Sequence, residues 1–290
     1  MVVKPQSRKV KRVIEPEPTI EGAGVRLKRS IGTKRLNYLD PFLLFDDFTS
    51  PNPADTVAGF PLHPHRGIET VTYLLEGEVR HKDTLGNSGS IGKGDVQWMT
   101  AGRGILHEEM PQARPEGIAG FQLWVNLPAK LKMTPPRYQG ILSDQIPEIR
   151  DEKGTRIRVI TGKVGKVAGP VAGIAADPIY LDVFLPAGGS FTLPVERGHS
   201  AFAYLFQGKA VFPGADRISA PGLVVLDDGD QVEVKAGESS ARLLLVSGKP
   251  LGEPIARYGP FVMNTREEIE QTLREIREGT FIDTVKRRNP

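Results

Sequence analysis

Short segments rich in β-branched and aromatic residues recur along the chain, and Gly, Pro or Asp bounds each of them. Such segments with turn-forming residues between them are typical of a β-sandwich or β-barrel. The 32 Gly and 24 Pro among 290 residues fit a fold with many tight turns. The predicted strands include residues 71–75, 121–125, 157–160, 180–185, 202–206 and 242–246.

One helix is predicted near the C-terminus. Thr265 and Glu268 have the spacing of a capping box, and Gly279 is placed to end the helix. The residues between them include an apolar stripe at helical spacing, which we expect to pack on a barrel. This stripe consists of Ile269, Leu273 and Ile276.

The two halves of the chain resemble each other. Residues 72–79 align with residues 203–210 at an offset of 131, and Gly94-Asp95 aligns with Gly229-Asp230 at an offset of 135. A strand–turn–strand unit that occurs twice predicts two similar domains.

Composition excludes several classes of protein. The chain has no Cys, which excludes disulfides, thiolate nucleophiles and Cys-ligated zinc. Five basic residues within residues 4–12 account for the net charge of +3, and the remainder is nearly neutral, so we expect no direct nucleic-acid binding. No apolar run approaches the ~20 residues of a membrane span. No secretory signal is evident, so we expect a cytoplasmic protein, with the nucleus possible in a eukaryote.

Two short segments carry the candidate chemistry. His63 and His65 lie two residues apart, as do His107 and Glu109. Because side chains alternate along a strand, each pair shares one face, and Glu69 is in phase with the first pair if that strand continues. Two adjacent strands would bring three imidazoles and one carboxylate together inside a barrel.

These ligand types suit Fe(II), Mn(II), Ni(II), Cu(II) or Zn(II). Four protein ligands on a metal that prefers six leave two positions for substrate and O2, as in non-haem oxygenases. Either pair alone is also common in surface or turn sequence, so the prediction depends on their combination. At offsets of 131 and 135, a different residue type stands at the position of every candidate ligand in the second half. This predicts a metal-free C-terminal domain. The replacements are Pro194, Glu196, Ser200, Arg242 and Leu244.

Five long segments resemble those of the pirin family, whose members are bicupins of the cupin superfamily. The resemblance implies an all-β fold of two cupin-type (jelly-roll) barrels packed face to face, with a C-terminal helix. We expect a basic flexible tail over 1–20, from its basic residues, and a linker over 135–148, from its prolines. The N-terminal cupin with the metal site would then span 21–134, and the metal-free C-terminal cupin with the helix would span 149–290. The segments that carry the resemblance are residues 39–48, 63–79, 95–111, 123–128 and 259–265.

The resemblance also implies a function. It implies one Fe(II) per chain, held by His63, His65, His107 and Glu109, with Glu69 beside the ligands. The expected activity is quercetin 2,3-dioxygenase, in which Glu109 or Glu69 is the base and O2 cleaves a flavonol with release of CO. The alternative is a redox-sensing or iron-sensing transcriptional co-regulator, or another regulator that binds a transcription factor or a metabolic enzyme. We expect a monomer.

Other residues near these segments have open roles. His81 lies among charged residues and is expected to be solvated. Arg66 and Arg103 flank the ligands, where they would bind an anionic substrate group or form ion pairs. A further set either lines the pocket or belongs to the core: Phe48, Trp98, Met99 and Trp124.

Overall fold

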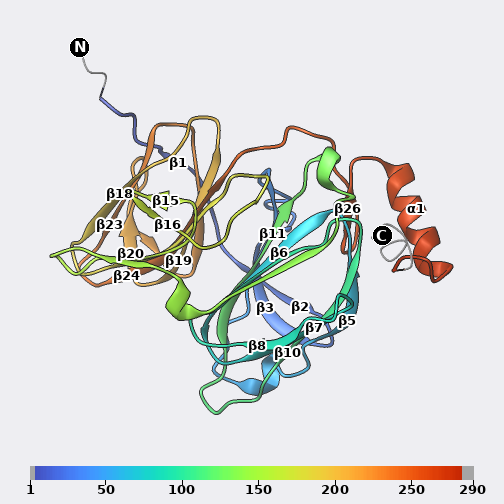
Figure 1. Ribbon diagram of the computed structural model, residues 1–290. Coiled ribbons are helices and arrows are strands. Elements are labelled where there is room, and N and C mark those ends of the chain that lie inside the picture. The colour runs from blue at the N-terminus through green and yellow to red at the C-terminus, as the bar shows by residue number, and fades with distance from the viewer. Residues whose placement is uncertain (1–3, 283–290) are drawn as a thin grey trace. The chain divides into compact units, whose positions relative to one another are not determined.

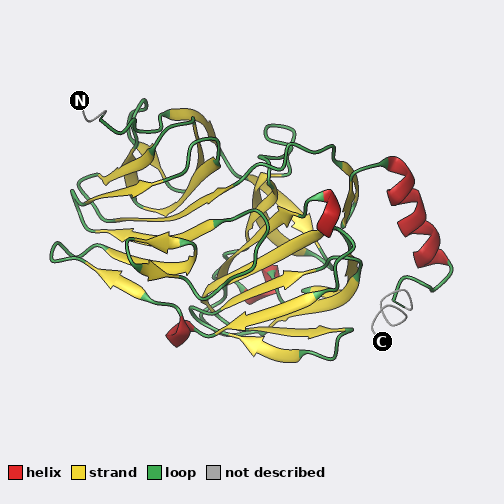
Figure 2. Cartoon of the chain, turned by 45° about the horizontal axis from the view of Figure 1, so that its top comes forward, coloured by secondary structure: helices red, strands yellow, loops and turns green. Residues whose placement is uncertain are grey.

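The computed structural model describes residues 4–282, and its regular secondary structure is mostly β-strand, as Figure 2 shows. Contacts divide the chain into two compact units. The C-terminal unit comprises Asp144–Pro250, Lys34–Pro41 and the described part of Met1–Glu17. The N-terminal unit comprises Pro18–Thr33, Phe42–Ser143 and the described part of Leu251–Pro290. No helix within residues 4–282 is long and apolar enough to cross a membrane.

The N-terminal unit contains two antiparallel sheets and a hairpin (Figure 1). The larger sheet has the order β12 (Arg137–Ile141), β9 (Val96–Thr100), β6 (Ile68–Glu76), β11 (Ala119–Asn126), β4 (Phe42–Asp47), β3 (Val25–Ile31) and β2 (Glu17–Glu21). The smaller sheet has the order β5 (Phe60–His65), β10 (Ile105–Pro111), β7 (Val79–Asp83) and β8 (Ser88–Ile91). The hairpin consists of β25 (Ala256–Tyr258) and β26 (Phe261–Met263), and three short 3-10 helices are η1 (Pro53–Asp55), η2 (Ala129–Leu131) and η3 (Ser143–Gln145).

The C-terminal unit repeats this arrangement. Its larger sheet has the order β1 (Val10–Ile14), β22 (Gly222–Leu226), β19 (Ser200–Gln207), β24 (Ala241–Gly248), β17 (Ile179–Leu185), β14 (Arg156–Thr161) and β13 (Glu148–Arg150). Its smaller sheet has the order β18 (Ser190–Pro194), β23 (Gln231–Ala236), β20 (Lys209–Val211) and β21 (Ile218–Ser219). A short hairpin joins β15 (Lys163–Val164) and β16 (Val167–Ala168).

The two strand orders correspond position by position, so the predicted repeat is confirmed. Strand β6 corresponds to β19, which is the pairing that the offset of 131 predicts. The offset of 135 is wrong, because Gly94-Asp95 precedes β9 whereas Gly229-Asp230 precedes β23. The counterpart of β9 is β22, and the counterpart of β23 is β10.

The structure divides the chain differently from the predicted domain boundaries. The predicted tail, 1–20, contains β1, which pairs with β22, and β2, an edge strand of the N-terminal unit. The predicted linker, 135–148, contains β12, which pairs with β9. Residues 251–282 belong to the N-terminal unit, not to the C-terminal one. Pairing with distant strands, which local composition does not reveal, accounts for these differences.

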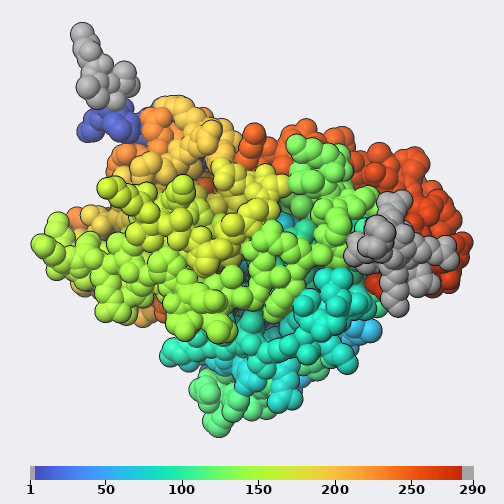
Figure 3. Space-filling model, in the orientation of Figure 1, coloured from blue at the N-terminus to red at the C-terminus, as the bar shows by residue number. Residues whose placement is uncertain are grey.

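The predicted helix is confirmed as α1 (Arg266–Arg277), in red in Figure 1. The Thr265 hydroxyl accepts from the Glu268 backbone N–H, and the Glu268 carboxylate accepts from the Thr265 backbone N–H, which completes the capping box. The helix contacts β25 and β26 of the same unit. Its outward face lies at the surface in Figure 3.

Candidate metal site and pocket

Three imidazoles meet inside the N-terminal unit. His63 on β5 lies directly opposite His107 on β10, and His65 follows two residues along β5 on the same face. The ring centroids are 4.4 Å apart for His63 and His107, 4.8 Å for His63 and His65, and 5.0 Å for His65 and His107. One nitrogen from each ring lies within 4.8 Å of the others, so these side chains form a group that could hold a metal ion.

The environment of these imidazoles fits a metal. Burial, followed by the neighbouring histidines, lowers the pKa of His65 and of His107 well below the ordinary value, so both rings are neutral. Among the described residues, neither ring nitrogen of His107 has a hydrogen-bond partner. The Nδ1 of His63 lies 2.8 Å from the Pro61 carbonyl and donates to it, so Nε2 is the nitrogen of this ring that could bind a metal. Neutral imidazoles with free lone pairs are ligands for first-row transition metals.

Glu109 lies beside the three histidines but is held by other side chains. It shares the inward face of β10 with His107, and its Oε1 accepts from the Gln97 amide and the Thr72 hydroxyl, each at 2.8 Å. Its carboxylate is not part of the group within 4.8 Å. Tyr138 extends the network, because its hydroxyl donates to the Gln97 carbonyl oxygen at 3.2 Å.

Glu69 does not share the site, in contrast to the prediction. Gly67, with a φ of +78°, makes a turn after β5, so the strand ends before Glu69. On β6, Thr72 faces Glu109, and Glu69 is an odd number of residues away, so it lies on the opposite face of the sheet. Its partner there is the Thr100 hydroxyl, at 2.7 Å.

Glu69 gives the protein a predicted pH dependence. Burial raises its pKa to about 7, although contacts with Thr100 and Trp98 act in the opposite direction. From about pH 4.5 to 7 the native state therefore keeps a proton that the unfolded chain has lost, so stability falls as pH rises. Glu69→Gln keeps the Oε1 acceptor and has no proton to lose. The free energy of unfolding of the variant, relative to wild type, should therefore rise by about 3 kcal/mol between pH 4 and 8. Urea titrations at both pH values measure it, and an advantage that stays constant with pH would contradict the assignment.

Sequence reasoning missed His81, which is buried rather than solvated. Its Nε2 lies 3.1 Å from the Asp83 carboxylate, its ring stacks on Tyr138 at 4.7 Å, and it lies 5.5 Å from the His107 ring. The signal in the sequence was strand alternation, which puts His81 and Asp83 on the same face as Val79, with Arg80 and Lys82 on the other, and the structure buries the face of Val79. His81 and Asp83 thus pack behind the three imidazoles.

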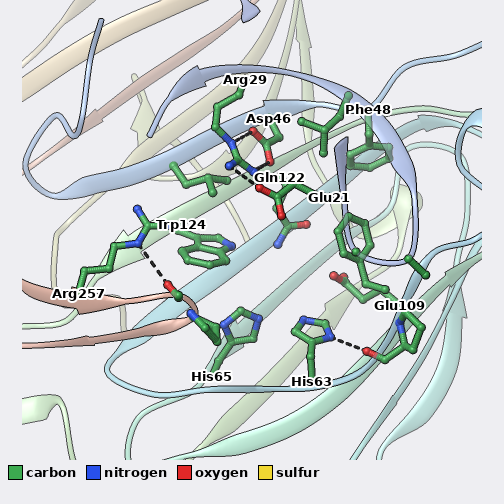
Figure 4. Close-up of a pocket in the computed structure, with 18 residues that line it drawn as sticks. Glu21, Arg29, Asp46, Phe48, His63, His65, Glu109, Gln122, Trp124 and Arg257 are labelled. Atoms are coloured by element: carbon green, nitrogen blue, oxygen red, sulfur yellow. Dashed lines mark hydrogen bonds and ion pairs between the residues drawn. The ribbon is translucent and has the colours of Figure 1, made fainter. Parts of the chain in front are cut away.

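A pocket of about 480 Å³ opens over the site (Figure 4). His63, His65 and Glu109 contribute to its wall, together with Trp124 and Phe48. The pocket thus has the histidines on one side, an aromatic surface beside them and charged side chains farther from them. Trp98 and Met99, by contrast, are fully buried and do not line this pocket. Its other lining residues include Leu27, Leu44, Phe60, Gln122, Arg29, Asp46, Glu21 and Arg257.

The turn that follows His65 is anchored by the C-terminal segment. The buried Arg66 guanidinium donates to the Arg103 carbonyl at 2.6 Å, the Thr272 hydroxyl at 2.9 Å and the Glu275 carboxylate at 2.6 Å. A Cβ on Gly67 would lie 1.9 Å from the Val262 carbonyl oxygen, so only glycine fits there. Arg66 is therefore a structural ion pair with α1 and is not available to a substrate.

The equivalent positions of the C-terminal unit are apolar. Strand β23 pairs with β18 and β20 as β10 pairs with β5 and β7, so the register identifies the counterparts of the ligands directly. The predicted replacements from the offsets were therefore wrong in detail. The counterparts of His63, His65, His107 and Glu109 are Leu193, Val195, Val232 and Val234, all buried in the core of that unit.

Comparison with known proteins identifies the family. A family model described as Pirin matches residues 24–125, and one described as the Pirin C-terminal cupin domain matches residues 180–282. A pirin-like protein of Caulobacter vibrioides is 46% identical over 275 residues, which cover 94% of this chain and 99% of that protein. The chain belongs to the pirin family. The two units are therefore cupin domains, as the sequence resemblance implied.

Two further pirin-family comparisons cover almost the whole chain. Human pirin is 42% identical over 277 residues, which cover 93% of each chain. A crystal structure titled quercetin 2,3-dioxygenase, from Acinetobacter baumannii, matches with a TM-score of 0.86 at 37% identity, over 95% of this chain and 99% of that one. The pirin fold therefore accounts for both units of the chain described above.

Proposed function

We propose that this pirin-family protein is an Fe(II)-dependent flavonol dioxygenase that cleaves quercetin-type substrates with O2 and releases CO. The observation that carries the proposal is the pocket of about 480 Å³, whose wall includes two of the three clustered histidines and an aromatic surface. Pockets of this size, mostly apolar with a few convergent polar groups, bind small molecules. The solved relative titled quercetin 2,3-dioxygenase supports the same substrate class.

We further propose that Glu109 completes the ligand set with His63, His65 and His107. Bound iron would act as a Lewis acid that brings the substrate and O2 together. The carboxylate of Glu109 faces the pocket and is the candidate base for the flavonol 3-hydroxyl proton. Thr72 and Gln97 hold the Oε1 of Glu109 in place, and Trp124 and Phe48 provide flat apolar surfaces for the substrate rings. Glu69, on the other face of the sheet, takes no part.

The proposal predicts that anaerobically purified, Fe(II)-loaded protein releases CO from quercetin when O2 is added. Glu109→Gln should reduce turnover by about 10²–10⁴-fold, the usual contribution of a general base. Glu108→Gln is the matched control, because Glu108 is the adjacent residue and points away from Glu109 along β10. Metal content is measured for each variant. Iron-loaded wild-type protein that releases no CO would refute the enzyme proposal and favour the alternative, a regulator that binds a protein partner.

A further inference from the structure

Two arginines line the pocket, and they differ in whether an ion pair neutralises their positive charge. Each guanidinium nitrogen of Arg29 donates to a carboxylate, with Asp46 at 2.8 and 2.7 Å and Glu21 at 2.7 Å. Arg257 forms no ion pair among the described residues. Its hydrogen bonds are two long ones, each 3.3 Å, to the carbonyls of Gly259 and Leu43. Its guanidinium therefore keeps unused N–H donors at the pocket.

Arg257 is nevertheless held in a defined place. Its guanidinium carbon lies 5.0 Å from the centre of the Trp124 ring, a cation–π contact. The same indole meets the His65 ring edge-on at 5.1 Å. Figure 4 shows Arg257 and Trp124 on the wall next to His65. Because one indole separates the guanidinium from the imidazole, an aromatic ligand that lies along this wall reaches both.

No carboxylate of the described residues lies within ion-pair distance of Arg257. Burial and the positive charge of Arg29 lower the pKa of Arg257, whereas the charges of Asp46 and Glu21 raise it, and the net direction is a lowering. A planar guanidinium edge with free donors matches the two oxygens of a carboxylate better than a single phenolate oxygen.

We propose that the pocket binds an aromatic carboxylate, with its rings along Trp124 and its carboxylate on Arg257. This inference rests on the proposed function in taking the same pocket as the reaction site. Ring cleavage of a flavonol creates such a ligand. The two atoms of O2 end in an ester carbonyl and a carboxylate, the carbon between them leaves as CO, and no further oxidant or reductant is needed. Arg257 is then a specificity residue that contacts the acid group of the product.

The test compares two probes that differ in one group. 3,4-Dihydroxybenzoate and 3,4-dihydroxybenzamide share a catechol that can bind metal, but only the first carries a carboxylate. Calorimetric titration of metal-loaded protein without O2 should show about tenfold tighter binding of the benzoate to wild type. Arg257→Gln should remove this preference, and Arg257→Lys should keep part of it. Arg266→Gln is the matched control, since Arg266 is exposed on α1 and should leave the preference unchanged.

Each outcome decides the inference. Equal binding of the two probes to wild type, no binding of the benzoate, or a preference that survives Arg257→Gln would overturn it. Quercetin turnover without a benzoate preference would leave the proposed function standing and the inference refuted. A benzoate preference that depends on Arg257, in a protein that does not turn over quercetin, would support the inference and refute the proposed function. Metal content and melting temperature of each variant show that the fold is retained.

Discussion

His107→Ala protein is expected to purify with little metal and to show no flavonol turnover. His107 is the central ring of the site, because it is fully buried and lies against both His63 and His65. No other described side chain occupies its ring nitrogens, so alanine removes a ligand and leaves nothing in its place. Loss of a group that only orients a ligand weakens metal binding by about 10- to 100-fold, and loss of the ligand itself should exceed that.

The measurement is metal content by mass spectrometry, followed by competition with a chelator of known affinity. Val232→Ala is the matched control, because Val232 is the buried apolar counterpart of His107 in the C-terminal unit. That variant should hold as much metal as wild type. Full metal occupancy in His107→Ala protein would show that the ion is bound elsewhere and would refute the three-histidine site.

The second large effect is expected from the link between Arg66 and α1. Glu275→Ala leaves the Arg66 guanidinium buried without its carboxylate. Breaking a buried ion pair by removing one partner costs about 3–5 kcal/mol, because the remaining charge is uncompensated. Arg66 follows His65 directly in the chain, so we also expect weaker metal binding in this variant. The same helix thus contributes to stability and to the geometry of the site.

The two tryptophans make this measurement specific. Trp98 and Trp124 are the only tryptophans of the chain and both lie in the N-terminal unit, so fluorescence in a urea titration reports on that unit. Glu270→Ala is the matched control on α1, because Glu270 forms an exposed ion pair with Arg266 that should contribute at most about 1 kcal/mol. Equal unfolding midpoints for the two variants would refute a role for the buried pair.

The histidine cluster could be predicted from the sequence because it depends on one simple regularity. Side chains two residues apart share a face of a strand, which puts His63 with His65 and His107 with Glu109. The prediction also assumed that the two strands are adjacent, and β5 and β10 do pair. The capped helix needed no such assumption, since Thr265 and Glu268 form the capping box within four residues.

The predictions that failed have different physical reasons. Glu69 seemed in phase with His65 only because the turn at Gly67 could not be recognised from alternation alone. His81 was taken for a surface residue because its neighbours are charged, whereas the sheet turns Arg80 and Lys82 outward and His81 inward. The offset of 135 failed because a Gly-Asp pair precedes two strands that are not counterparts, β9 and β23, so only the register gives the counterparts.

The membership of residues 251–282 in the N-terminal unit has a consequence for how the protein is made. A ribosome synthesises all three histidines long before it reaches the hairpin and helix that anchor the turn after His65. The N-terminal unit therefore remains incomplete while residues 144–250 of the C-terminal unit are translated. Its final packing waits for the last helix to leave the exit tunnel, so the unit that contains the histidine cluster is completed only after the C-terminal unit has been synthesised.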